Sequence, residues 1–469
     1  MSLRLFITAT LGAVLSARQV NSAAVPPSQA TIVDTLNGSY YGLYNQVYNQ
    51  DIFLRVPYAQ PPLKELRFRP PHSLNTTWSG LRNATELGHS CVGYGEDTEI
   101  AAKNHTSEDC LSLNIARPAG NSSTPLPVAV WIHGGGWIAG SSANGWYNVS
   151  FLVERSVQLQ QPIIGVSINY RLAGWGWLHS DEVVAEGSTN VGLRDQRLAL
   201  HWVKENIAAF GGDPSKITIF GESAGSHSVS SHLLAYNGRD DGLFHAAIGQ
   251  SGSIAGLGPW EPTVEKLSLA TANITETVCP KATDKLACLR QADFETLNNA
   301  INASLSLPYA SVFGPVMDGD ILVRPRVEQL RDGDFVDIPF LLGTNNDETG
   351  YYAPAGINND LELHQGLIQA WDLNGTGWEG HEAPFLGGNP FEGRPQPYLD
   401  LAAVMSGMWV GFINNGVPYY DKQPVPEWPP YKGEDPSIMN FDAQPEYLNT
   451  RVEKEVRAAQ QDFIISQLF

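Results

Sequence analysis

Short apolar runs rich in β-branched residues recur along the chain and alternate with longer amphipathic stretches. The runs at 128–132, 163–168, 217–220, 246–248 and 338–342 predict strands. Residues 193–210 place Trp202, Val203 and Phe210 near one helical face, and Gly211 follows them, which predicts an amphipathic helix with a glycine stop. Such apolar strands alternating with helices predict an α/β fold, with a mostly parallel central sheet that has helices on both faces.

One predicted strand runs directly into a serine-containing turn. Residues 217–220 lead into Gly-Glu-Ser-Ala-Gly at 221–225, and a helical pattern follows. Gly-x-Ser-x-Gly between a strand and a helix is typical of a nucleophilic serine on a sharp, strained turn. The alternative interpretation is a glycine-rich connecting loop with an unrelated serine, but the flanking strand and helix favour a catalytic Ser223.

A second motif, His-Gly-Gly-Gly-Trp at 133–137, ends the strand predicted at 128–132. Consecutive glycines let backbone N–H groups approach a developing oxyanion that side chains would otherwise block. We therefore expect the N–H groups of Gly135, Gly136 and Ala224 to form an oxyanion hole beside Ser223.

The N-terminus has the pattern of a secretory signal. Arg4 precedes an apolar stretch at 5–15 that is too short to span a bilayer, and small residues suit cleavage after Ala24, with Ala17 as the alternative. We predict a signal peptide at 1–24 and a single domain at 25–469, because no linker or internal repeat interrupts the rest. No later segment has 18 uninterrupted apolar residues, so we expect no transmembrane segment.

Asparagine sequons and cysteines agree with export. Nine Asn-x-Ser/Thr sequons lie at Asn37, Asn75, Asn83, Asn104, Asn121, Asn148, Asn273, Asn302 and Asn374. The four cysteines form two local pairs without a Cys-x-x-Cys motif, which favours disulfides over zinc. We predict the disulfides Cys91–Cys110 and Cys279–Cys288, each closing a loop.

Charge and histidine placement narrow the function classes. The formal net charge of −20 would repel a phosphate backbone, which excludes nucleic acid as a partner. The histidines show no metal-ligand spacing, so we expect neither a metal nor a cofactor. His227 and His232 follow Ser223 on its helix and are expected to pack or to lie on the helix surface, and His133 is expected to be structural.

Longer segments carry a resemblance to a known family. They are "RVPYAQPP", "LRFRPP", "SEDCLSLNI", "WIHGGGW", "NYRLAGWGWL", "NVGLRDQRLALHWVKENIAAFGGDPSKITIFGESAGS", "AAIGQSGS", "FGPVMDGD" and "LLGTNNDETG". In this order they resemble the type-B carboxylesterase/lipase family of the α/β-hydrolase fold, as a fungal-type member. The resemblance implies that Ser223 is the nucleophile, that Arg67 and Glu108 form a structural ion pair, and that the Cys91–Cys110 loop corresponds to the lid of the lipases.

The resemblance also places the acid of a catalytic triad on Glu348, in a polar loop after the strand predicted at 338–342. A buried carboxylate there would hold the imidazole tautomer and stabilise the imidazolium that forms during the reaction. The alternative is an exposed loop glutamate, as most glutamates are.

The triad histidine is ambiguous. The fold's order is serine, acid, histidine, with a helix and a strand before the histidine, yet the family pattern resumes at Tyr398, about fifty residues after Glu348. His364 precedes a segment similar to the one after the family's histidine, and His381 lies in a Gly/Pro-rich loop. We assign His364 as the triad histidine, with His381 as the alternative. A third possibility, that neither histidine completes the triad, stays open. The short interval fits a shortened homologue or an incomplete gene model, and it predicts that a C-terminal strand is missing.

These features predict two-step hydrolysis of a small carboxylic ester through an acyl-enzyme on Ser223. The segment between Cys91 and Cys110 is rich in acidic residues and offers little apolar surface to lipid, which favours soluble esters, with lipase activity as the alternative. The hypothesis from another class is an inactive relative with a binding or adhesion role. The sequence leaves the oligomeric state open.

Overall fold

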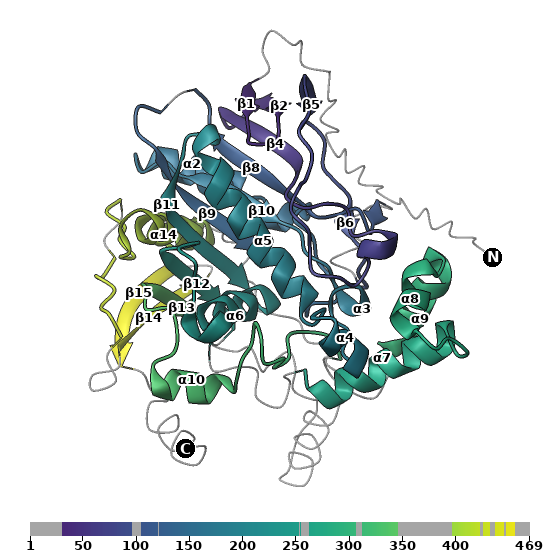
Figure 1. Ribbon diagram of the computed structural model, residues 1–469. Coiled ribbons are helices and arrows are strands. Elements are labelled where there is room, and N and C mark those ends of the chain that lie inside the picture. The colour runs from purple at the N-terminus through teal and green to yellow at the C-terminus, as the bar shows by residue number, and fades with distance from the viewer. Residues whose placement is uncertain are drawn as a thin grey trace, which may run out of the picture.

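The fold is described from a computed structural model over residues 31–95, 105–120, 122–252, 254, 262–305, 312–345, 396–422, 425–431, 437–444 and 447–454. An eight-stranded sheet, in the order β13-β12-β11-β9-β10-β8-β4-β3, forms its centre (Figure 1). Its strands are β3 (Leu43–Asn45), β4 (Gln50–Pro57), β8 (Ser112–Pro118), β9 (Leu126–Ile132), β10 (Ile164–Ile168), β11 (Gly212–Glu222), β12 (Ala246–Gln250) and β13 (Phe340–Gly343). The strands from β13 to β10 run parallel and the remaining three alternate in direction, so the predicted mostly parallel sheet is confirmed.

All five predicted strands are present, but each differs from its predicted bounds at one end or both, and β11 and β13 show why. β11 was predicted at 217–220 and is longer, because Glu222 still pairs with Gln250 of β12. β13 was predicted from residue 338 and begins at Phe340. Pro339 has no N–H to donate, and its carbonyl accepts from the Ala247 N–H at 3.0 Å, so proline stands at the entrance of the strand.

The helices in the described residues are α2 (Ser150–Gln158), α3 (Ala173–Gly176), α4 (Asp181–Ala185), α5 (Val191–Asn206), α6 (Ala224–Gly238), α7 (Val264–Val278), α8 (Lys285–Gln291), α9 (Phe294–Ser304), α10 (Arg326–Asp332) and α14 (Gln396–Asn415). Of these, α2, α5, α6 and α14 pack against the eight-stranded sheet. The predicted amphipathic helix is α5 with a short 3₁₀ extension, Ile207–Phe210, and it ends at Gly211 with φ 83°. That prediction, including its glycine stop, is confirmed.

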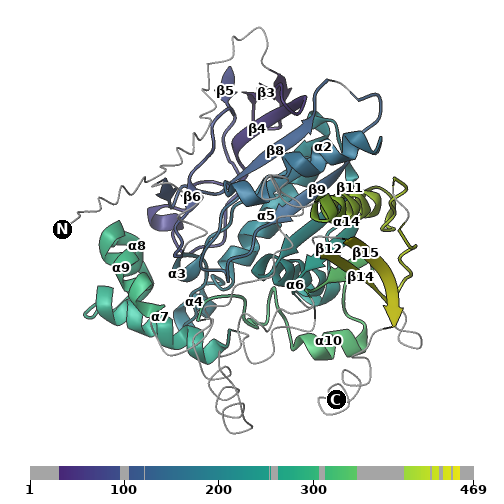
Figure 2. The ribbon, with the colours of Figure 1, turned by 180° about the vertical axis from the view of Figure 1, so that it is seen from behind.

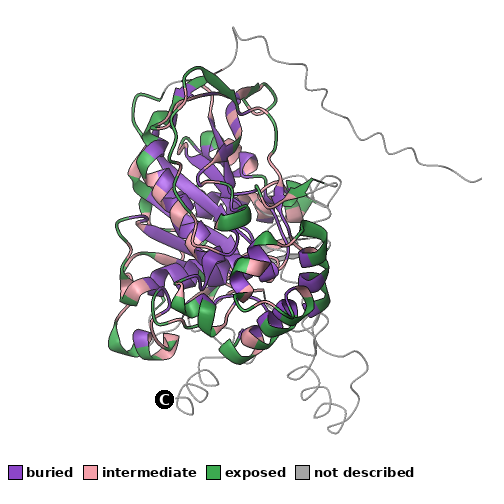
Figure 3. Cartoon of the chain, turned by 45° about the vertical axis from the view of Figure 1, so that its right-hand side comes forward, coloured by how far each residue is buried: buried purple, intermediate pink, exposed green. Residues whose placement is uncertain are grey.

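Alternate residues of β9 pack into two hydrophobic clusters. Val130 and Ile132 belong to the cluster that includes α5 and α6, whereas Ala129 and Trp131 belong to the one that includes α2 and α14. Figure 1 shows α5 and α6 in front of the sheet, and Figure 2 shows α14 from behind. Buried strands therefore lie between partly exposed helices (Figure 3), as the continuous apolar runs predict.

Smaller elements surround this core. They are a sheet of β1 (Ile32–Asp34), β2 (Ser39–Tyr41) and β5 (Leu81–Asn83), the pair β6 (Ser90–Cys91) and β7 (Thr106–Ser107), and the hairpin β14 (Ser437–Gln444) and β15 (Tyr447–Lys454). Across the described ranges, β13 is the outermost strand on its side. Residues 346–395 lie outside them, so the missing C-terminal strand stays a prediction, as do the signal peptide and the single domain. No helix within the described part is long and apolar enough to cross a bilayer.

Candidate active site

The serine turn lies where β11 ends and α6 begins. Ser223 has φ 57° and ψ −125°, a backbone conformation that costs a non-glycine residue about 1–3 kcal/mol. Its N–H donates to the Gln250 carbonyl of β12 at 2.9 Å, and its carbonyl accepts from the His227 N–H at 2.9 Å. The neighbouring strand and the first turn of the helix thus hold the strained backbone, which is the arrangement expected of a nucleophile turn.

Close backbone approach explains the glycine after the serine. A Cβ at Gly225 would lie 2.1 Å from the Ile132 carbonyl oxygen at the end of β9, a distance that no real Cβ tolerates. The turn therefore sits directly against the strand that leads into the glycine motif. Only glycine lets α6 begin so close to β9.

The predicted oxyanion loop follows β9 and lies beside Ser223. A Cβ at Gly134 would lie 3.0 Å from the Cβ of Ser223. Gly135 and Gly136 have φ 97° and 60°, and no partner for their N–H groups is found within the described residues. Ala224 is the first residue of α6, so its N–H has no partner inside the helix. The structure thus places Gly134 beside Ser223, with Gly135 and Gly136 next on the same loop and Ala224 directly after the serine.

His133 packs inside the loop. Its ring stacks on Tyr170 with centroids 4.5 Å apart, and its Nδ1 lies 2.9 Å from the Gly134 carbonyl oxygen, to which a neutral ring can donate. Burial lowers the pKa of His133 to about 4, so the ring is neutral near pH 7. His133 therefore supports the loop, as expected.

His227 and His232 are buried on α6, so of the two expected placements they pack rather than face solvent. The Nε2 of His232 lies 3.1 Å from the Oε1 of Gln196 on α5. Burial lowers the pKa of His232 to about 3, so this ring too is neutral at physiological pH.

Acid should destabilise the fold through His232. Between its ordinary pKa of 6.5 and its folded value of about 3, the unfolded chain holds a proton that the folded protein lacks. The free energy of unfolding therefore falls as the pH falls, by about 3 kcal/mol between about pH 7 and pH 4.5. In urea titrations at both pH values, the free energy of unfolding of His232→Gln should fall by about 3 kcal/mol less than that of the wild type. His72→Gln, at an exposed histidine, controls for the substitution, and equal losses in His232→Gln and wild type would contradict the assignment.

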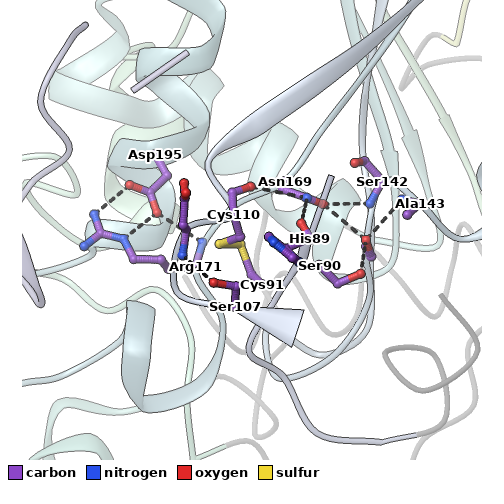
Figure 4. The surroundings of a disulfide bond; sticks show 12 residues. His89, Ser90, Cys91, Ser107, Cys110, Ser142, Ala143, Asn169, Arg171 and Asp195 are labelled. Atoms are coloured by element: carbon purple, nitrogen blue, oxygen red, sulfur yellow. Dashed lines mark hydrogen bonds and ion pairs between the residues drawn. A yellow bond between two sulfur atoms is a disulfide. The ribbon is translucent and has the colours of Figure 1, made fainter. Parts of the chain in front are cut away.

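Both predicted disulfides, Cys91–Cys110 and Cys279–Cys288, are present. Close to the first, Asn169 at the end of β10 joins three segments (Figure 4). Its Nδ2 donates to the carbonyls of His89 at 3.1 Å and Cys110 at 3.3 Å, and its Oδ1 accepts from the Ser142 N–H at 2.8 Å. Asn169 thus connects the disulfide to the loop that continues from the glycine motif.

The predicted ion pair between Arg67 and Glu108 is also present. Two guanidinium nitrogens reach the two carboxylate oxygens at 2.6 and 2.8 Å, and the third donates to the Leu289, Arg290 and Ala292 carbonyls at 2.9–3.2 Å. The two side chains are only 8% and 10% exposed. Arg67 therefore fixes the segment that contains Cys110 to the end of α8.

Truncating Arg67 should be costly, because it leaves the buried Glu108 carboxylate unpaired. We expect Arg67→Ala to lower the free energy of unfolding by about 3–5 kcal/mol in urea denaturation. Arg69→Ala is the matched control, since Arg69 pairs with Glu186 while 36% exposed, and it should cost at most about 1 kcal/mol. Similar losses in both variants would show that the buried pair contributes no more than the exposed one.

Several predicted site residues lie outside the described residues. They are Glu348, His364 and His381, together with the sequon residues Asn104, Asn121 and Asn374. Of the other sequon residues, Asn37 is half-buried, and the exposed ones are Asn75, Asn83, Asn148, Asn273 and Asn302. No group of His, Cys, Asp and Glu within the described ranges is arranged to hold a metal ion.

Sequence reasoning missed the side chains that support the oxyanion loop. Trp137 ends the glycine motif, has φ 58° and is 2% exposed, and its indole Nε1 donates to the Ser228 hydroxyl at 3.1 Å. Ser228 lies one helical turn after Ala224, a spacing that can be read from the sequence. Nothing in the sequence joins that helix position to a tryptophan 91 residues earlier.

Comparisons with known proteins show the family of this chain. The family model described as "Carboxylesterase family" matches residues 29–374. The chain is 38% identical over 372 residues to Lipase 4 of Diutina rugosa, covering 72% of this chain and 65% of that protein. It is 37% identical over 406 residues to Lipase 2 of Diutina rugosa, with 79% and 72% covered. Over 331 residues it is 38% identical to Secreted lipase 1 of Botryotinia fuckeliana, with 65% and 57% covered. The chain thus spans 57–72% of the length of these relatives, and it belongs to the carboxylesterase family.

Proposed function

We propose that the chain hydrolyses carboxylic esters through an acyl-enzyme on Ser223. The observation that carries this proposal is the strained Ser223 backbone at the β11–α6 junction, with Gly134 so near that a Cβ there would lie 3.0 Å from the Ser223 Cβ. Strain at such a turn is maintained only where the surroundings hold it, and it concentrates at functional sites. Membership of the carboxylesterase family supports the same reaction.

The proposed reaction begins when a histidine takes the proton from the Ser223 hydroxyl and the oxygen attacks the ester carbonyl carbon. The N–H groups of Gly135, Gly136 and Ala224 stabilise the oxyanion, and each donor is worth about 10²–10³ in rate. The imidazolium then protonates the departing alcohol. Water attacks the acyl-enzyme by the same route, releasing the acid and restoring the serine.

The other two members of the triad are also part of the proposal. Glu348 is the carboxylate that orients the imidazole, and His364 is the base, with His381 as the alternative. His133 and His232 are poor candidates for the base, because burial keeps both rings neutral down to about pH 4 and each is held by a neighbouring polar group. A base that lies among residues 346–395 fits the order serine, acid, histidine.

For the substrate we propose soluble carboxylic esters, on the acidic composition of the Cys91–Cys110 segment. Lipase activity is the second candidate, favoured by the names of three relatives. Turnover of a dissolved short-chain ester compared with an emulsified long-chain triglyceride separates the two. We further propose secretion after removal of 1–24, supported by the relative named a secreted lipase and by sequons that lie on the surface.

The test of the proposed function is labelling of secreted, folded protein with a fluorophosphonate probe. We expect the probe to modify Ser223, the Ser223→Ala variant to remain unlabelled, and the same preparation to hydrolyse a p-nitrophenyl ester. Folded wild-type protein that neither reacts with the probe nor turns over the ester would favour the binding or adhesion role instead.

A further inference from the structure

A buried polar network lies directly behind the proposed oxyanion hole. The hydroxyl of Ser228, on α6, donates to the carbonyl of Ala224 at 2.8 Å. It accepts from the indole Nε1 of Trp137 at 3.1 Å and from the Nε2 of Gln196, on α5, at 3.1 Å. Ser228 and Gln196 are 0% exposed and Trp137 is 2% exposed, so water does not compete for these groups.

Donor and acceptor chemistry fixes the direction of every bond in this network. Trp137 Nε1 and the Gln196 amide nitrogen can only donate, so the serine hydroxyl accepts twice and its one proton goes to Ala224. The Oε1 of Gln196 accepts from the Nε2 of His232 at 3.1 Å, and that ring is neutral. With the Gln196 amide in this orientation, both lone pairs and the proton of Ser228 are used.

The network connects the two parts of the proposed oxyanion hole. Trp137 directly follows Gly136, so its indole anchors the loop that supplies two of the donors. Ala224 supplies the third donor at the start of α6. The glycine loop and the start of α6 are separate backbone segments. The Ser228 hydroxyl contacts the first through the Trp137 indole and the second through the Ala224 carbonyl. An oxyanion hole requires its donors to keep their relative positions without rearrangement during the reaction.

We propose that Ser228 is a positioning residue, whose hydroxyl sets the distance between the Gly135–Gly136 loop and the Ala224 N–H through Trp137. This inference rests on the proposed function, because it assigns those N–H groups to the oxyanion. Ser228 does not touch the reacting atoms. Its removal should therefore weaken transition-state stabilisation by less than the loss of a donor, and it should leave ground-state binding almost unchanged.

The same helix supplies a matched control. Ser231 is also 0% exposed, donates to the carbonyl four residues earlier, His227, at 2.8 Å, and accepts from Arg326 of α10 at 3.2 Å. It thus has the local chemistry of Ser228 without the link to the glycine loop. A role in helix stability alone predicts the same behaviour for both serines.

The test compares Ser228→Ala, Trp137→Phe, their combination and Ser231→Ala with the wild type. We expect Ser228→Ala to lower kcat about 10-fold and to change KM by less than about 2-fold. The affinity for a trifluoromethyl ketone inhibitor should fall by the same factor as kcat/KM. Trp137→Phe keeps an aromatic ring, though a smaller one, and removes the N–H donor, so it should give a similar loss of kcat. The double variant should be little worse than either single variant. Ser231→Ala should lower the Tm but leave kcat within about 2-fold of wild type.

Three results would overturn the inference. They are additive losses in the double variant, a rise in KM that accounts for the loss in Ser228→Ala, and an equal loss of kcat in Ser231→Ala. If Ser228→Ala fails to fold, Trp137→Phe alone decides, by its kcat and its affinity for the ketone. Failure of the proposed function is distinct, because wild-type protein would then not react with a fluorophosphonate at Ser223. Reaction of the wild type with unchanged variant kinetics would remove only the role of Ser228.

Discussion

Ser223→Ala should lower kcat for ester hydrolysis by about 10⁴-fold or more, because no acyl-enzyme can form without the hydroxyl. The variant should still fold, since the N–H of residue 223 keeps its bond to Gln250 and the new side chain is smaller. The measurement is the steady-state rate with a p-nitrophenyl ester, alongside circular dichroism of the same sample. Activity within tenfold of the wild type in a folded variant would show that another group is the nucleophile.

A glycine at the same position separates catalysis from backbone strain. Ser223→Gly removes the hydroxyl as well, but glycine adopts φ 57° and ψ −125° with far less strain than alanine. We expect both variants to be inactive and the glycine variant to have the larger free energy of unfolding, by about 1 kcal/mol. If alanine is the more stable of the two in urea denaturation, the turn stores no strain, and the observation that carries the proposed function is weakened.

The parts of the site that local pattern governs were predictable from the sequence. β9 and β11 are continuous apolar runs that end in glycine-rich motifs, and parallel strands bring their carboxyl ends to one edge of a sheet. Those two facts place both motifs at one edge of the sheet, and the sheet order, with β9 beside β11, brings Gly134 close to Ser223. The cysteine pairs were likewise predictable, because each closes a short local loop.

Contacts between distant segments were not predictable in the same way. The indole of Trp137 meets Ser228 only because β9 and α6 pack together, and Gln196 reaches the same hydroxyl from α5. The β14–β15 hairpin was not predicted either, since its packing against α14 depends on tertiary contacts. The triad histidine was ambiguous for a related reason: local sequence around His364 and His381 does not specify which ring reaches Ser223.

The second large effect is expected from Gly225→Ala. The added Cβ would lie 2.1 Å from the backbone oxygen of Ile132, so β9 and the start of α6 must move apart. That movement shifts the Ala224 N–H away from the Gly135–Gly136 loop. We expect a loss of about 10²–10³ in kcat, comparable to deletion of an oxyanion donor, and a free energy of unfolding lowered by about 3 kcal/mol from overpacking.

Gly145→Ala provides the matched control, because a Cβ at Gly145 meets nothing within 4 Å and no positive φ is required there. It should keep wild-type activity and stability. Structure determination of Gly225→Ala adds a geometric check, since the Ile132 oxygen should move away from residue 225. If β9, the serine turn and α6 act as one rigid unit, a single methyl group at this contact should abolish most of the activity. A stable Gly225→Ala variant with wild-type kcat would show that β9 and α6 can move apart without disturbing the proposed oxyanion hole.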